Sequence, residues 1–116
     1  MAILTFTRTI PAASSLNDTL QNQRIAYVPQ GAQAYRVRLY ATSDSTSVEH
    51  ELFIGGDNPL ERSTVSAANR IPVVPDDFVL ETYADPGERI VLNLHNTDPT
   101  NSHDYFGRIE VDPLVL

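Results

Sequence analysis

The chain has 116 residues, no cysteine and a formal net charge of −7. A single domain of this length buries roughly two thirds of the surface that its unfolded chain exposes, so a hydrophobic core alone can hold it. The acidic balance argues against a nucleic-acid partner, because phosphates are bound by clustered cations. The lack of cysteine excludes disulfides and thiolate metal sites.

No stretch approaches the roughly 18 to 20 consecutive apolar residues of a membrane-spanning helix. Residues 1–10 also lack the basic lead-in and long apolar core of a secretory signal. We therefore expect no membrane partner. The length predicts one domain, over residues 1–116.

A first strand is predicted near the N-terminus, where Leu4, Phe6 and Ile10 alternate with threonines until Pro11. Residues 11–24 are mostly small and polar, with Leu16 and Leu20 four residues apart, and we expect either an extended arm or loop or a single helical turn there. A short run of alternating residues follows and ends at a proline.

Two strands are predicted over residues 34–42 and 48–54, joined by the loop 43–46. This loop predicts a hairpin in which apolar side chains meet apolar ones and opposite charges meet. The predicted pairs are Val37 with Leu52, Ala41 with Val48, Arg38 with Glu51 and Arg36 with Phe53.

Residues 55–59 are predicted to form a flexible, solvated loop, followed by one edge strand near 63–67. Prolines at positions 72 and 75 exclude residues 71–76 from a central strand.

The clearest alternation lies in the C-terminal third, over residues 78–84, 89–96 and 106–111. The turn 85–87 predicts a three-residue loop in which Gly87 takes the left-handed conformation. The register then predicts a meander that sets Leu80 opposite Leu92, Phe78 opposite Leu94, and Leu94 opposite Ile109.

Turn signals recur about every 8 to 12 residues, and no helix longer than a turn or two is predicted. This pattern predicts an all-β fold: a single β-sandwich or small jelly roll of about seven or eight mostly antiparallel strands.

Candidate metal ligands gather on the last loop, at His95, Asp98, His103 and Asp104. Their spacing fits no zinc pattern or calcium loop, so we expect a solvated connection and no metal or other cofactor. Whether the His95–Asp104 loop holds an ion stays open at this stage.

Three further polar residues are interpreted as structural and not as catalytic. His50 falls on the apolar side of its strand, which predicts a hydrogen-bonded core or rim histidine. Glu49 and Glu51 share one face, and Arg38 is their expected cross-strand partner, so we do not expect paired-carboxylate catalysis.

The run Pro86–Asn96 resembles the penultimate strand shared by cupredoxin-like and immunoglobulin-like sandwiches. This resemblance implies a sandwich architecture only, since a blue-copper site would require a cysteine thiolate.

The C-terminus ends in Leu114, Val115 and Leu116 without a polar finish. Exposing these side chains would cost about 25 cal/mol per Å² of apolar area. We therefore expect the tail, residues 113–116, to dock on its own sheet or on a neighbouring subunit.

A small, acidic, cysteine-free β domain with an apolar tail resembles bacteriophage capsid decoration (cement) proteins and other small virion β-sandwich proteins. The resemblance implies a non-enzymatic structural protein of the virion, forming homo-oligomers such as trimers on a larger capsid protein. The expected subunit interface comprises Leu114, Val115, Leu116, Arg36, Arg38, Tyr40 and Phe53, because arginine and aromatic residues are enriched at interface cores.

The alternative is a ligand-binding module, with carbohydrate as the ligand. In it, aromatic rings would serve as stacking platforms. The candidates are Tyr35, Tyr40, Tyr83 and Tyr105.

Overall fold

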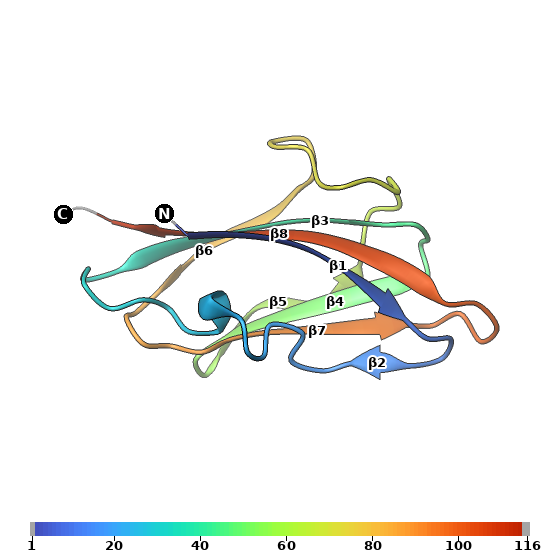
Figure 1. Cartoon of the computed structure of the whole chain (residues 1–116), viewed down its shortest axis with the longest axis horizontal. Coiled ribbons are helices and arrows are strands. Elements are labelled where there is room, and N and C mark those ends of the chain that lie inside the picture. The colour runs from blue at the N-terminus through green and yellow to red at the C-terminus, as the bar shows by residue number, and fades with distance from the viewer. Residues whose placement is uncertain (1, 115–116) are drawn as a thin grey trace.

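The computed structural model describes residues 2–114, which form eight β-strands and one short 3-10 helix (Figure 1). The strands are β1 (Ala2–Ile10), β2 (Ser15–Leu16), β3 (Tyr35–Ser43), β4 (Val48–Ile54), β5 (Asp57–Thr64), β6 (Phe78–Ala84), β7 (Ile90–Asn96) and β8 (His103–Pro113). The helix η1 spans Arg24–Ala26. Within the described range, no helix has the length and apolar character needed to cross a membrane.

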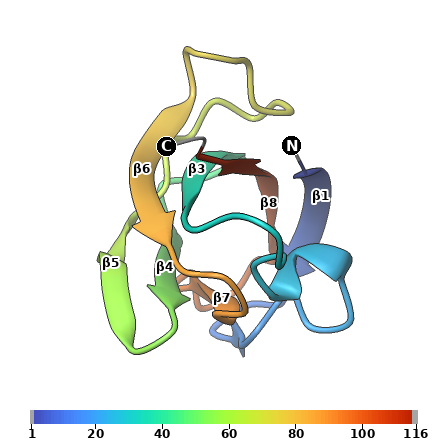
Figure 2. The same ribbon diagram turned by 90° about the vertical axis from the view of Figure 1, so that its left-hand side faces the viewer.

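The strands form two four-stranded sheets, with the order β1-β8-β3-β6 in sheet A and β2-β7-β4-β5 in sheet B. All strand pairs are antiparallel, and the two sheets lie one above the other (Figure 2). The neighbours β1/β8, β2/β7, β3/β6 and β4/β5 are those of an eight-stranded jelly roll. The predicted all-β fold and its number of strands are confirmed.

The core lies between the sheets because alternate side chains of each strand point inward. β4 has the simplest pattern, with every second residue buried from Val48 to Ile54. The largest fully buried apolar side chains come from both layers and from the segment after β1: Tyr105, Ile10, Leu20, Leu39, Leu52, Ile90, Leu92, Leu94 and Ile109.

The hairpin predicted from residues 34–42 and 48–54 is wrong. β3 pairs with β6 and β8 in sheet A, whereas β4 pairs with β5 and β7 in sheet B. Val37 and Leu52, which were expected to be neighbours, face the core from opposite layers. Residues 44–47 carry the chain across the roughly 10 Å between packed sheets, and both apolar faces are buried equally well that way.

The predicted meander is wrong for the same reason, because β7 belongs to sheet B while β6 and β8 belong to sheet A. Leu80 lies opposite Leu39, and Leu92 lies opposite Leu52. The left-handed conformation predicted at Gly87 is confirmed, with φ at +82°. This turn redirects the chain from one sheet to the other.

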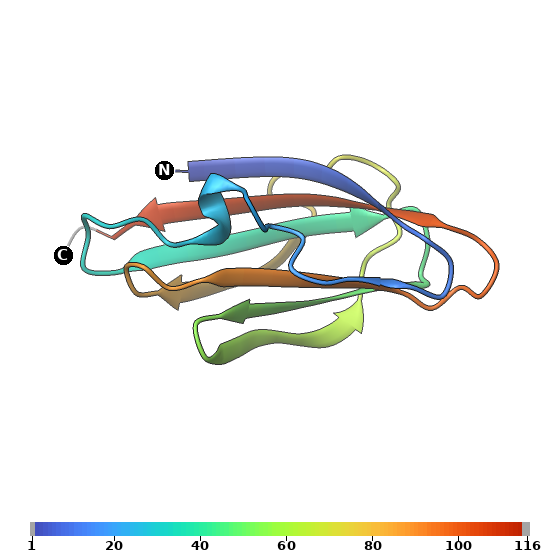
Figure 3. The ribbon, with the colours of Figure 1, turned by 60° about the horizontal axis from the view of Figure 1, so that its bottom comes forward.

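The arm predicted at residues 11–24 is folded back onto the domain's own sheet B (Figure 3). Ser15 and Leu16 pair with β7, and the amide of Thr19 donates to the carbonyl of Leu92. Leu20 is fully buried. The segment therefore closes one side of the sandwich.

The flexible loop predicted at residues 55–59 is mostly strand. β5 begins at Asp57, directly opposite Ile54, so the hairpin turn is confined to two glycines. An edge strand was expected near 63–67, and β5 is an edge strand that starts earlier. Pro59 is tolerated because an edge strand has one unpaired side.

Candidate subunit interface

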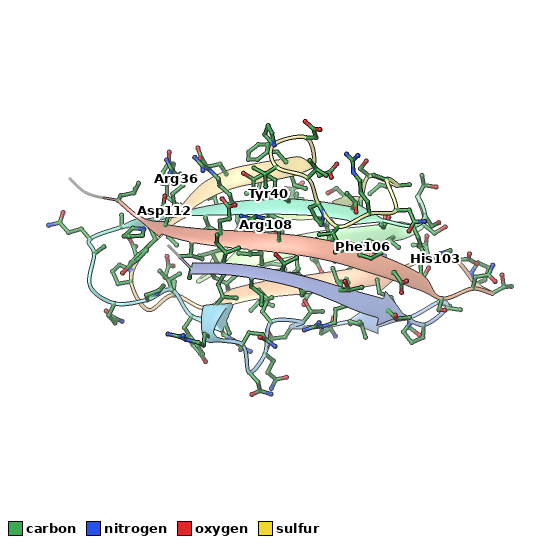
Figure 4. The ribbon with its side chains drawn as sticks, turned by 45° about the horizontal axis from the view of Figure 1, so that its top comes forward. Arg36, Tyr40, His103, Phe106, Arg108 and Asp112 are labelled. Carbon is green, nitrogen blue, oxygen red and sulfur yellow. The ribbon has the colours of Figure 1, made fainter. Side chains whose placement is uncertain are left out.

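The outer face of sheet A carries alternating charges on neighbouring strands (Figure 4). Side chains directly opposite each other in a sheet share a face. Across β3 and β8, Arg36 lies opposite Asp112, Arg38 opposite Glu110, and Tyr40 opposite Arg108. Two of the predicted interface residues, Arg36 and Arg38, are therefore neighbours on this face.

Three arginines and three carboxylates form a charge ladder across β8, β3 and β6. The shortest contacts are Arg36 Nη2 to Asp112 Oδ2 at 2.9 Å, Arg38 Nε to Glu81 Oε1 at 2.8 Å, and Arg108 Nε to Glu110 Oε2 at 2.8 Å. The hydrogen bond with Glu81 raises the pKa of Arg38. The ladder is charge-balanced, so this face offers no concentrated cation for a phosphate backbone.

Aromatic rings border this ladder. Tyr40 is only 4% exposed, because Phe78 stands edge-on against it at a centroid distance of 5.8 Å. Phe78 and Tyr83 on β6 are themselves exposed. The expected contribution of Tyr40 to an open face thus belongs to Phe78 and Tyr83.

Phe53 does not join Arg36, Arg38 and Tyr40. It lies on β4 in sheet B, opposite Val91, whereas the other three lie on β3 in sheet A. The predicted four-residue face depended on the β3–β4 hairpin, and it divides between two sheets once that pairing is absent.

β1 is an edge strand of sheet A, paired only with β8. Its outward-facing Ile3, Thr5, Thr7 and Thr9 are all exposed. β1 contains no proline, and Arg8 is its one charged side chain. The lack of proline and the single charged side chain were visible in the sequence, but the position of β1 at the edge of the sheet follows only from the strand order.

An open groove of about 860 Å³ lies where β1 begins. Ile3 and Tyr27, which are 49% and 58% exposed, help to line it. The remaining lining comes from β1, η1 and the turns nearby: Ala2, Leu4, Gln23, Arg24, Ile25, Val28, Pro29, Gln30 and Gly87. The groove is mostly apolar, and sequence reasoning did not predict it.

The C-terminal end of β8 lies beside the start of β1, since Ala2 pairs with Val111. Leu114 is half-buried, and its amide donates to the carbonyl of Ala34 at 3.0 Å. Val115 and Leu116, the other predicted docking residues, lie outside the described residues.

Two of the predicted metal-ligand candidates, His103 and Asp98, are in contact. The other ring nitrogen of His103 contacts Asp44, which was not a candidate, and His95 lies elsewhere. His103 Nε2 lies 2.8 Å from Asp98 Oδ2, and His103 Nδ1 lies 3.0 Å from Asp44 Oδ1. These carboxylates raise the pKa of His103. Asp104 accepts a hydrogen bond from Thr9 instead.

His95 lies on the outer side of sheet B, in a separate contact. Its Nδ1 is 2.7 Å from Ser15 Oγ, and its Nε2 is 3.0 Å from Glu51 Oε1. Among residues 2–114, no three or more His, Asp or Glu side chains are grouped so that they could hold a metal ion.

The carboxylates of Glu49 and Glu51 are both engaged, but not with Arg38 as expected. Arg62 Nε donates to Glu49 at 2.8 Å, and His95 contacts Glu51. Arg38 instead binds Glu81, because β3 lies in the other sheet. The two carboxylates thus have separate hydrogen-bonding partners.

His50 is a buried histidine, as predicted, and is 2% exposed. Its Nδ1 lies 2.9 Å from the Tyr105 hydroxyl across the sandwich. The histidine is therefore hydrogen-bonded in the core.

The tyrosines proposed as stacking platforms do not form a common surface. Tyr35, Tyr40 and Tyr105 are each at most 4% exposed, whereas Tyr83 is 62% exposed. A ring must present a face to solvent before a sugar can stack on it. Only Tyr83 of these four meets that condition.

A scan of protein-family models gives no match to this chain, and a search of curated proteins gives none either.

Proposed function

We propose that the protein is a non-enzymatic structural subunit of a virion, which works by binding copies of itself and a larger capsid protein. The observation that carries this proposal is the long unpaired edge of β1. It continues into the apolar groove at one end of the molecule.

An edge strand presents unpaired amide and carbonyl groups, which are a template for pairing with another chain. The other edges are shorter or carry blocking features: β2 has two residues, β6 has seven and includes Glu81, and β5 contains Pro59, Glu61 and Arg62. Proline and charge on an edge strand discourage pairing. β1 has little of this protection, so we assign it the subunit contact.

The apolar groove and the C-terminal tail supply a second contact. Exposed Ile3 and Tyr27 line the groove, and the end of β8 lies beside it. We propose that Leu114, Val115 and Leu116 dock on a neighbouring subunit. Burial of leucine and valine side chains is worth about 1.5 to 3 kcal/mol each.

The virion assignment rests on fold analogy and on the fact that the polar groups considered as reactive already have partners within the fold. Jelly rolls of eight strands are used by viral capsid domains and also by lectins and cupins, so the fold alone does not fix the function. The carboxylates and histidines considered as reactive groups contact other side chains of the fold. This arrangement favours a structural role.

Light scattering after size-exclusion chromatography tests the subunit contact directly. We expect the full chain to be oligomeric, with trimers as the expected form, and Thr5→Lys with Thr7→Lys to shift it to monomer. Thr64→Lys is the matched control, because Thr64 is an exposed threonine on the edge of sheet B. A full chain that stays monomeric at every concentration would contradict the proposal.

Deletion of residues 113–116 separates the tail from the β1 edge. We expect the truncated chain to dissociate at higher concentration than the full chain does. The capsid partner is tested by the gene's neighbours: an operon without capsid genes would argue against a virion role.

A further inference from the structure

His50 has a second ring nitrogen whose role the fold does not explain. The side chain is 2% exposed, and Nδ1 is occupied by the Tyr105 hydroxyl at 2.9 Å. No hydrogen bond joins Nε2 to another of residues 2–114, and Nε2 is not one of the side-chain atoms that are both closed to solvent and without a partner. Buried polar groups in folded proteins almost always have partners. The partner of Nε2 is therefore solvent or a bound molecule.

The Tyr105 hydroxyl determines which nitrogen of His50 carries the proton. A hydroxyl donates one hydrogen bond, and a fully buried one needs an acceptor. His50 Nδ1 is the acceptor that the structure provides for the hydroxyl of Tyr105. Since Nδ1 accepts, the proton of the neutral ring is on Nε2, and burial holds the pKa of His50 at about 4. The ring thus presents an N–H donor.

This donor belongs to the wall of a cleft between β5 and β6. The cleft has a volume of about 490 Å³, within the usual range of small-molecule sites. Ser63 lies opposite His50 in the strand pairing, so their side chains share the inner face of sheet B. The remaining lining residues come from β3, β5, β6 and the connection between β5 and β6: Ala41, Leu60, Thr64, Val65, Ser66, Asp76, Asp77, Phe78 and Val79.

Backbone hydrogen bonds hold the walls of the cleft in place. The amide of Ser43 donates to Ser66, that of Val65 to Val48, and that of Ala41 to Asp77. Long ordered connections such as residues 65–77 are commonly functional. A preformed site loses less entropy when a ligand binds.

The charges at the cleft favour a neutral ligand. Asp76 and Asp77 repel an anion. Asp77 is already bound by Arg70 at 3.0 and 3.1 Å and by the amide of Val73 at 2.8 Å, so it offers little to a cation. What remains, besides the exposed carboxylate of Asp76, is a set of uncharged hydrogen-bonding groups beside apolar carbon.

We propose that this cleft binds a small neutral polyol of monosaccharide size, with His50 Nε2–H donating to one of its oxygens. The hydroxyls of Ser63 and Ser66 supply both donors and acceptors for a ligand that is hydroxylated all round. Leu60, Val79 and the half-exposed Phe78 provide apolar surface for its C–H groups. This inference does not depend on the proposed subunit function.

Long-range ¹H–¹⁵N NMR of the histidine side chains in the full chain tests the proposal. The free protein should show His50 as the Nε2–H tautomer. Glucose, galactose, mannose and N-acetylglucosamine are then added one at a time. We expect at least one to shift the His50 signals saturably, with a Kd on the order of 1 to 10 mM. The signals of His95 should stay in place.

Two variants that fill the cleft make the assignment specific. Ser63→Leu and Ser66→Leu should each raise the Kd about tenfold or more, whereas Ser102→Leu, an exposed serine outside the cleft, should leave it unchanged. Ser66 is exposed, so its variant should fold even if Ser63→Leu does not. Glycerol controls for general solvent effects. Shifts no larger than those with glycerol, or equal Kd values in all variants, would overturn the proposal.

Discussion

The ring of Phe6 on β1 lies directly over Gly107 on β8, the residue that pairs with it. A Cβ atom on residue 107 would lie 2.5 Å from Cζ of Phe6, far inside van der Waals contact. The ring also packs against Tyr105 at a centroid distance of 6.0 Å. The missing side chain at position 107 therefore allows β1 to keep both its pairing and its buried ring.

Gly107→Ala should destabilise the fold by about 1 to 3 kcal/mol, because the added methyl forces the Phe6 ring from its place. Urea denaturation measures this loss. Gly56→Ala is the control, since a Cβ there meets nothing within 4 Å. In the double variant with Phe6→Leu, the cost of Gly107→Ala should shrink. Simple additivity of the two changes would contradict the steric explanation.

The ion pairs of His103 predict a pH window of stability. The hydrogen bond with Asp98 raises the pKa of His103 above 6.5, so this contribution is complete below that pH and is lost as the pH rises through the raised value. Hydrogen bonds from the Thr100 amide and from His103 lower the pKa of Asp98 below 3.8. Its contribution is present above that pH and is lost as the pH falls. The combined contribution of His103 and Asp98 to the free energy of unfolding should be greatest between about pH 4 and 6.5.

Unfolding free energies of the wild type and of His103→Gln, measured by urea titration from about pH 4 to pH 9, check the prediction. The difference between the two proteins should narrow on the alkaline side. A constant difference from pH 5 to pH 9 would mean that His103 is not charged in its pair. An NMR titration should independently place the His103 pKa above 6.5 and that of His50 near 4.

Tyr105→Phe should cost about 1 to 3 kcal/mol, because it leaves His50 Nδ1 buried without its hydrogen bond. Tyr27→Phe removes the same hydroxyl from a ring that is 58% exposed, and it should have little effect. Thermal or urea unfolding compares the two. The tautomer of His50 should also become mixed in Tyr105→Phe, which the NMR spectrum of the imidazole reports.

The fold class and most strand positions could be predicted from the sequence because alternation reports which side of a strand is buried. β3, β4, β6, β7 and β8 all lie within the predicted alternating segments or extend them by a few residues. Alternation does not report which strand is the neighbour. Val37 and Leu52 are both buried, and they face each other's layer from opposite sheets. A hairpin that placed them side by side would have buried them as well.

The candidate interface was only partly predictable for the same reason. Arg36 and Arg38 share a face because they lie two residues apart on one strand, which needs no knowledge of pairing. Phe53 was assigned to that face through the β3–β4 pairing, and it lies on the other sheet. The β1 edge and the groove beside η1 depend on long-range topology, which a local pattern does not encode.

An arm extending from the domain was one of the conformations predicted for residues 11–24, yet Leu20 in this segment is fully buried. Leu20→Ala should therefore cost about 2 to 5 kcal/mol, as a core leucine does, and should speed amide exchange at Thr19, whose amide bonds Leu92. Gln21→Ala, at an exposed neighbouring position, is the matched control. Urea unfolding with hydrogen exchange measures both effects. Equal stabilities of the two variants would mean that the segment contributes nothing to the core, and that it is free to reach a neighbouring subunit after all.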